Sequence, residues 1–529
     1  MNKGMIKMNI KNLSLEQKIG QMIIAGFPSS EIDEHFNEIV EKNHIGNIIL
    51  FARNILDAKQ LNSLNRVIQQ KMIKSNGVEA FIAIDQEGGI VNRIYEGVTL
   101  FPGNMAIAAS GIEDAAYNTG RFSGKELKAL GINLNLAPVL DVNNNPDNPV
   151  IGVRAYSDNA EIVASKGIEY TLGLQGEGVA AVGKHFPGHG DTNVDSHLSL
   201  PSVLHDFKRL NEVELVPFKN AIKRGIEGIM IAHILFPAIE TERLPGTLSQ
   251  KVITGLLREQ LGFDGLIITD CMEMKAIADY YGTVDAVVMA VKAGADLICI
   301  SHTKQYQIDA TKAIIKAVEE GEISIQRIDK SVERILKVKD KYKSTTEKDL
   351  SSIVGCQEHK NFARFISQNS ITLVHNNLNL IPLKTNNILF ISPEAKVLTG
   401  ADGYEENINF GKDASESIGG SFITIKINPL ESDIEKIIEK VENYDVVVFA
   451  TCNSHLNLGQ QRLLEQVLQI KKEVIHVALR NPYDVVSSKE AGSVLCSYEY
   501  TRPAVESIIN ILKGESVAKG KLPIRMRVR

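Results

Sequence analysis

Length, composition and charge exclude several classes of protein. The 529 residues are 44% hydrophobic and 23% charged, which is typical of a folded chain and not of a disordered one. The net charge of −6 gives no electrostatic reason to expect nucleic acid as a partner.

The chain also lacks the sequence features of membrane and exported proteins. It has no run of about 18 apolar residues, so we expect no membrane span. Its lysine-containing start is not followed by the apolar stretch of a signal peptide. The five cysteines are scattered without a CxxC pair, which suits reduced thiols better than a disulfide framework. We therefore expect a cytoplasmic protein with neither a membrane nor a nucleic-acid partner.

Short apolar runs recur along the first 300 residues, each followed by a stretch with helical periodicity. They are near-continuous in Val, Ile, Leu and Ala, as strands of a parallel sheet covered on both faces are. The eight runs span residues 21–27, 45–51, 80–85, 134–142, 179–186, 228–234, 265–270 and 295–301. Eight β-α units in succession predict a (β/α)₈ TIM barrel. A doubly wound open sheet is the alternative.

A second set of strands follows a basic helix predicted over 327–344. Five apolar runs, at 387–392, 421–427, 446–451, 474–479 and 493–498, predict an open parallel sheet in a smaller α/β sandwich domain. We expect a catalytic barrel over 1–344, a polar linker over 345–359 and the sandwich over 360–529. The second half carries no GxGxxG or P-loop motif, so we predict no nucleotide site there.

Polar residues stand where the predicted barrel strands end, which is where barrel enzymes carry their active groups. They are Asp85, Lys184, His185, His233 and Asp270. A structural core does not need this convergence of charge. Other interpretations remain for single members, because an aspartate after a strand is often a helix N-cap.

The loop KHFPGHGDTNVDSHLSLP (184–201) is the densest polar segment of the chain. In Asp195-Ser196-His197 a carboxylate can reach an imidazole two residues away, fix its tautomer and favour its protonated form. This pattern predicts an acid/base site on the loop. Its histidines could instead be solvated or bind a structural metal.

Four segments together resemble the signature segments of glycoside hydrolase family 3, and more narrowly its bacterial β-N-acetylglucosaminidase branch. They are DQEGGIVNR (85–93), IGVRAYSD (151–158), KHFPGHGDTNVDSH (184–197) and IITDCMEM (267–274). The resemblance implies Asp270 as the nucleophile and His197, oriented by Asp195, as the acid/base. It implies sugar-binding roles for Asp85, Arg93, Arg154, Lys184 and His185.

The resemblance implies a retaining hydrolase that removes β-linked N-acetylglucosamine from cell-wall muropeptides or related small glycosides. We expect no metal and no organic cofactor, and no chemically essential residue beyond about 350. Three alternatives remain open: a phosphorylase on the same fold, a non-catalytic sugar-binding protein, and a metal-dependent barrel hydrolase. The metal ligands would be His185, His189, Asp191 and His233.

Overall fold

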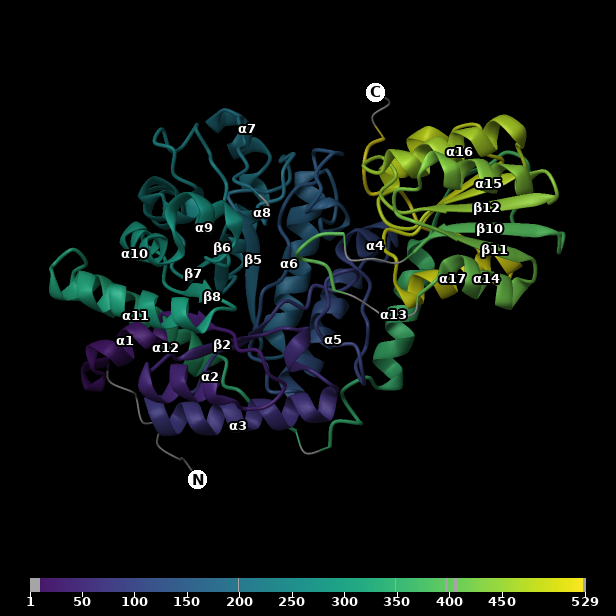
Figure 1. The fold of residues 1–529 in the computed structure, drawn as a ribbon. Coiled ribbons are helices and arrows are strands. Elements are labelled where there is room, and N and C mark those ends of the chain that lie inside the picture. Colours follow the sequence, from purple (N-terminus) through teal and green to yellow (C-terminus); the bar gives the residue numbers. More distant parts are fainter. Residues whose placement is uncertain (1–9, 198, 348, 395–397, 404–407, 527–529) are drawn as a thin grey trace.

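The computed structural model describes residues 10–197, 199–347, 349–394, 398–403 and 408–526. Figure 1 shows two bodies side by side. The purple-to-teal body contains the first eight strands, and the green-to-yellow body contains the last six strands.

The first body is a barrel of eight parallel strands in the order β7-β6-β5-β4-β3-β2-β1-β8. An isolated parallel bridge between Ile268 and Leu297 brings the two ends of this order together. The strands are β1 Ile23–Ala25, β2 Asn47–Leu50, β3 Ile82–Ile84, β4 Leu134–Asn135, β5 Ala180–Phe186, β6 Gly228–Ile231, β7 Leu266–Thr269 and β8 Ile298–Ile300. Each lies within one of the eight predicted runs, and the barrel prediction is confirmed over the open-sheet alternative.

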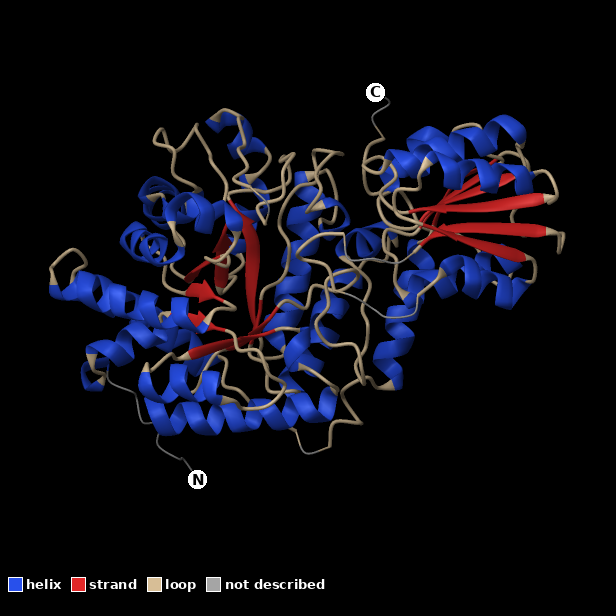
Figure 2. Cartoon of the chain, in the orientation of Figure 1, coloured by secondary structure: helices blue, strands red, loops and turns tan. Residues whose placement is uncertain are grey.

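Helices surround these strands because their apolar faces cover the barrel (Figure 2). They are α1 Leu15–Gln21, α2 Glu34–Asn37, α3 Ala58–Asn76, α4 Asn104–Ala109, α5 Ala115–Ala129, α6 Ala160–Gly176, α7 Phe207–Glu212, α8 Leu215–Lys223, α9 Lys275–Tyr281, α10 Thr283–Ala293, α11 Lys304–Glu319 and α12 Ile325–Lys341. Two π-helices, η2 Glu38–Lys42 and η6 Lys251–Gln260, complete the ring. Helix α12 is the basic helix predicted at the end of the barrel.

The second body is a six-stranded sheet in the order β11-β10-β12-β13-β14-β9. Its strands are β9 Thr372–Asn376, β10 Ile388–Pro393, β11 Ser421–Ile425, β12 Val446–Thr451, β13 Val474–Ala478 and β14 Ser493–Cys496. Its helices are α13 Gln357–Ser370, α14 Phe410–Ile418, α15 Glu431–Val441, α16 Leu458–Ile470 and α17 Arg502–Lys513. Helices cover both faces of the sheet (Figure 2), so the predicted α/β sandwich is confirmed.

One strand of this sheet was not predicted. Strand β9 pairs antiparallel with β14 at the sheet edge, and most of its residues are partly exposed, so it lacks the continuous apolar run of the other strands. Helix α13 begins at Gln357, inside the segment predicted as a linker. The domain boundaries at 344 and 359 stay a prediction. Among the described residues, no helix is both long and apolar enough to cross a membrane.

Candidate active site

A cavity of about 630 Å³ opens at the carboxyl ends of the barrel strands. Of the eight site residues predicted from the sequence, all but Asp195 line this cavity: Asp85, Arg93, Arg154, Lys184, His185, His197 and Asp270. Asp195 does not line the cavity, but its carboxylate is hydrogen-bonded to His197, which does. The structure therefore brings together side chains that are up to 185 positions apart, counted from Asp85 to Asp270.

One side of the cavity is a buried network of opposite charges. The Lys184 ammonium lies 2.7 Å from a carboxylate oxygen of Asp85 and 2.7 Å from one of Glu87. The Arg154 guanidinium donates to both oxygens of Glu87, at 3.0 and 2.8 Å. Burial opposes ionisation of Glu87, but the two cations outweigh it and hold its pKa well below the usual range. Arg154 and Lys184 thus stay charged with their heads fixed at the cavity wall.

Glu87 and Asp141 are site residues that the sequence analysis missed. Asp141 is fully buried, and its Oδ2 lies 2.7 Å from Nδ1 of His185. The same carboxylate accepts the backbone N–H of His189 at 2.7 Å. A carboxylate on Nδ1 fixes the imidazole tautomer and leaves Nε2 for a ligand. Glu87 stands two residues after Asp85 in the same motif, but no sequence signal marks Asp141 as a partner of His185.

The Asp195–His197 dyad has the geometry that the spacing predicts. Oδ1 of Asp195 lies 2.7 Å from Nδ1 of His197 and accepts the backbone N–H of His197 at 2.8 Å. Partial burial disfavours the imidazolium, but the Asp195 carboxylate, with help from Asp270, raises the pKa of His197 above its ordinary value. Nε2 remains as the second proton site of the ring, which lines the cavity.

Asp270 follows the last residue of β7 directly. Its Oδ1 accepts the backbone N–H of Cys271 at 2.7 Å. Burial raises its pKa, but His233, His185 and His197 outweigh that effect and lower it to about 2, so the carboxylate is ionised at neutral pH. The alternative that Asp270 caps a helix is wrong, because α9 begins four residues after Cys271 with Met274 at its N-cap.

A loop of the second domain completes the cavity, which the sequence analysis did not foresee. Residues 400–403 line it together with the barrel residues. Nη2 of Arg93 donates to the carbonyl oxygen of Ala401 at 3.1 Å. The loop carries no motif that would have assigned it to an active site, since its contacts to the barrel use backbone atoms.

The four side chains expected to bind the metal of a metal-dependent hydrolase each have a different hydrogen-bond partner. His185 is paired with Asp141. His189 lies beside Thr192 and Ser196, and burial lowers its pKa to about 4. Asp191 pairs with His205 at 2.6 Å, and Nδ1 of His233 lies 2.7 Å from the Thr247 hydroxyl. Throughout the part of the chain that the structure describes, no three His, Cys, Asp or Glu side chains form a group that could hold a metal ion.

Comparison with known protein families gives two matches. Residues 14–338 match the glycosyl hydrolase family 3 N-terminal domain, and residues 371–529 match the corresponding C-terminal domain. The chain belongs to glycoside hydrolase family 3. The resemblance inferred from the four sequence segments is thereby confirmed.

Individual relatives of this family 3 chain include proteins named for activity on N-acetylhexosamines. It is 30% identical to the β-hexosaminidase A of Pseudoalteromonas piscicida, over 97% of each chain. It is 40% identical to a solved family 3 β-N-acetylglucosaminidase from Paenibacillus sp. str. FPU-7, covering 98% of this chain and 100% of the other with a TM-score of 0.92. A solved β-glucoside phosphorylase shares the fold, with a TM-score of 0.81 at 23% identity.

Proposed function

We propose that this family 3 protein is a retaining β-N-acetylglucosaminidase. It removes terminal β-linked N-acetylglucosamine through a covalent intermediate on Asp270. The proposal rests on one observation: His197, hydrogen-bonded to Asp195, lines the same cavity as the ionised Asp270 carboxylate. This combination provides a nucleophile and a proton donor, which the cleavage of a glycosidic bond requires.

In the first step the Asp270 carboxylate attacks the anomeric carbon while the glycosidic bond breaks. His197, protonated on Nε2, gives that proton to the departing oxygen, so the aglycone leaves as a neutral alcohol. Asp195 stays ionised, because its bonds to His197 outweigh burial and lower its pKa, and it stabilises the imidazolium. The step ends with a glycosyl ester on Asp270 and a neutral imidazole.

In the second step His197 acts as a base. Its neutral Nε2 takes a proton from water, the water oxygen attacks the anomeric carbon, and the ester bond to Asp270 breaks. The sugar leaves with its original β configuration and both catalytic groups return to their starting states. Because neutral His197 serves as the base, it adds no negative charge beside Asp270 when the water oxygen approaches the anomeric carbon.

The remaining residues of the cavity suit a sugar ring. Asp85, Arg93, Arg154, Lys184 and His185 offer fixed donors and acceptors for hydroxyl groups. The charge network holds Asp85, Arg154 and Lys184 in place. Asp141 holds His185, and the carbonyl oxygen of Ala401 accepts from Arg93. The names of the two relatives support an N-acetylhexosamine at this position. We further propose muropeptides or related cell-wall glycosides as the substrates and the cytoplasm as the compartment.

Turnover of matched nitrophenyl β-glycosides of N-acetylglucosamine and glucose tests the proposal. We expect release of free N-acetylglucosamine and a strong preference for the N-acetylated sugar, unchanged after exhaustive chelation. The same assay with added inorganic phosphate separates hydrolysis from phosphorolysis. Appearance of the sugar 1-phosphate as the main product would replace the hydrolase with the phosphorylase alternative, and a preference for glucose would overturn the proposed sugar.

A further inference from the structure

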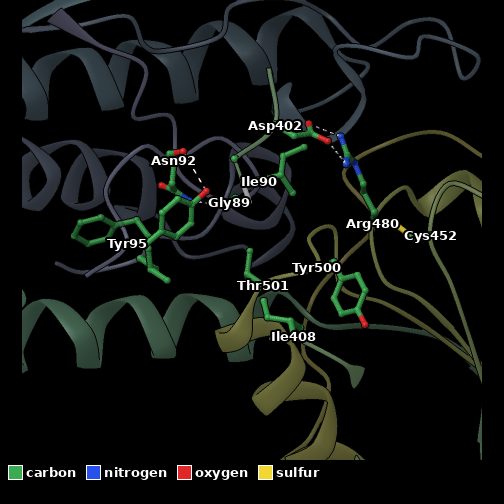
Figure 3. A pocket seen from close by; sticks show the side chains of 13 residues that line it. Gly89, Ile90, Asn92, Tyr95, Asp402, Ile408, Cys452, Arg480, Tyr500 and Thr501 are labelled. Carbon is green, nitrogen blue, oxygen red and sulfur yellow. Dashed lines mark hydrogen bonds and ion pairs between the residues drawn. The ribbon is translucent and has the colours of Figure 1, made fainter. Parts of the chain in front are cut away.

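At the edge of the sugar cavity, one ion pair belongs entirely to the second domain. Asp402 lies on the loop 398–403, and Arg480 lies two residues after the end of β13. The guanidinium donates to both carboxylate oxygens, at 2.8 and 2.9 Å (Figure 3). Their side chains are 8% and 2% exposed for Arg480 and Asp402, so this is a buried, two-point pair and not a surface contact.

Asp402 also organises its own loop. Its Oδ2 accepts the backbone N–H groups of Leu398 and Thr399 at 2.9 and 3.2 Å. Its Oδ1 accepts the Thr399 hydroxyl at 2.8 Å. One carboxylate therefore closes the loop on itself and ties it to the second sheet through Arg480.

The opposite side of the same loop contacts the barrel through its backbone. Gly403 donates its N–H to the carbonyl oxygen of Ile90 at 2.8 Å, and Ala401 accepts from Arg93. A Cβ atom added at Gly400 would lie 2.8 Å from Cδ2 and 3.2 Å from Nε2 of His197, so the bare backbone at this position packs against the imidazole. The loop thus touches one residue assigned to sugar binding and the residue assigned to proton transfer.

A second, smaller cavity of about 50 Å³ lies beside the pair, between the two domains. Figure 3 shows Asp402 and Arg480 on one side of it and Asn92 and Tyr95 of the barrel on another. The barrel supports this loop at Gly403, where an added Cβ would lie 1.9 Å from the Tyr95 hydroxyl oxygen, and the cavity leaves free space beside the pair. On the side of the second domain, the two-point ion pair to Arg480 restrains the loop.

We infer that Arg480, acting through Asp402, is a positioning residue that holds loop 398–403 against His197 and Arg93. Neither residue of the pair is assigned a role in the chemistry. Without the pair, the loop would move into the space beside it, and the His197 ring, which Asp195 holds at Nδ1, would lose the backbone that packs against Cδ2 and Nε2. The inference rests on the proposed function for the roles of His197 and Arg93, but not for the geometry of the loop.

The principal test is the double variant Asp402→Asn with Arg480→Gln. Removing both charges together avoids leaving one buried charge unpaired, which would be strongly destabilising. Arg480→Lys keeps the charge but loses the two-point geometry, and it serves as the conservative comparison. The matched control is Arg462→Gln, which alters an exposed pair with Glu431 in the same domain.

Two measurements do not require turnover. Amide hydrogen exchange of residues 398–403 should be about tenfold faster or more in the double variant, partly faster in Arg480→Lys and unchanged in Arg462→Gln, since local opening is what exchange reports. The imidazole Cε1–H resonance of His197, assigned with a His197→Gln variant, should shift in the double variant. Unchanged exchange or an unchanged resonance in the double variant would overturn the inference.

Kinetics provide the functional measurement. A misplaced acid matters most for a poor leaving group, so kcat/KM should fall about tenfold or more further on an N-acetylglucosaminyl disaccharide than on the nitrophenyl glycoside. Gly400→Ala should produce the same pattern by crowding His197, whereas Gly176→Ala, where a Cβ meets nothing within 4 Å, should not. Equal losses on both substrates would overturn the positioning role. Wild-type protein that releases no N-acetylglucosamine would refute the proposed function instead, with exchange and resonance still deciding the inference.

Discussion

Replacing His197 by alanine separates proton transfer from every other contribution of the site. The dyad raises the pKa of His197 above its ordinary value, which favours the protonated ring that acts as the acid. General acid catalysis contributes about 10²–10⁴-fold, equivalent to about 3–5 kcal/mol of the barrel enzyme's transition-state stabilisation. A sugar alcohol needs this proton to leave, whereas a nitrophenolate hardly does. We expect the full loss in glycosylation on a disaccharide and a much smaller loss on the nitrophenyl glycoside.

The assay compares kcat/KM on both substrates and follows the first turnover of the nitrophenyl glycoside. Loss of the base should slow release of the glycosyl ester and produce a burst of nitrophenol. His205→Ala is the matched control, because His205 also pairs with an aspartate at 2.6 Å and its side chain is 32% exposed, as is that of His197. His205→Ala should leave both activities close to wild type. Equal losses on both substrates for His197→Ala, without a burst, would refute the reasoning and reduce His197 to a sugar contact.

Two further predictions concern residues that support the site. Glu87→Gln should destabilise the folded barrel by about 3–5 kcal/mol, because it removes the carboxylate that Arg154 and Lys184 share in the buried network. Urea unfolding measures this loss of stability. An unfolding midpoint equal to that of the wild type would contradict the prediction. Asp195→Asn should move the basic limb of the pH profile of kcat/KM on a disaccharide to lower pH, since the neutral amide no longer raises the pKa of His197. A basic limb at the wild-type position in Asp195→Asn would mean that another group sets it.

Much of the fold was accessible from the sequence because parallel strands buried on both faces leave continuous apolar runs. All eight barrel strands lie within such runs, as do four of the six strands of the second sheet, and β10 extends one residue beyond its run. Strand β9 escaped detection because its residues Leu373 to Asn376 are exposed or half-buried at an edge. An edge strand needs no continuous apolar sequence, so its pairing with β14 depends on tertiary contacts that local pattern does not record.

Four of the predicted site residues lie in a barrel strand near its end or directly after it: Asp85, Lys184, His185 and Asp270. The rule that strand ends meet at one mouth therefore placed Asp85, Lys184, His185 and Asp270 together before the structure did. Pairs of residues that are distant in the sequence and meet only in the folded protein could not be predicted in this way. The pairing of Asp141 with His185 spans 44 positions, and that of Arg93 with Ala401 spans 308.

Loop 398–403 of the second domain shows more clearly that contacts made in the folded protein cannot be predicted from local sequence patterns. The prediction that no residue beyond about 350 is chemically essential was based on the absence of an acid/base pattern there, and it stays untested. The structure adds a contribution of another kind, since the backbone of residues 400–403 forms part of the cavity. Backbone contacts of Gly400 and Ala401 depend on the docking of two domains and leave no residue pattern of their own.

The most direct test of the account is to trap the covalent intermediate. A fluorinated N-acetylglucosaminyl substrate that forms the ester faster than it is hydrolysed should inactivate the enzyme and add one sugar to the chain. Peptide mapping should locate that sugar on Asp270, whose carboxylate is ionised in the cavity. Label on Glu273 or Asp264, or complete turnover through an inverted product with no covalent adduct, would contradict the assignment of Asp270 as the nucleophile.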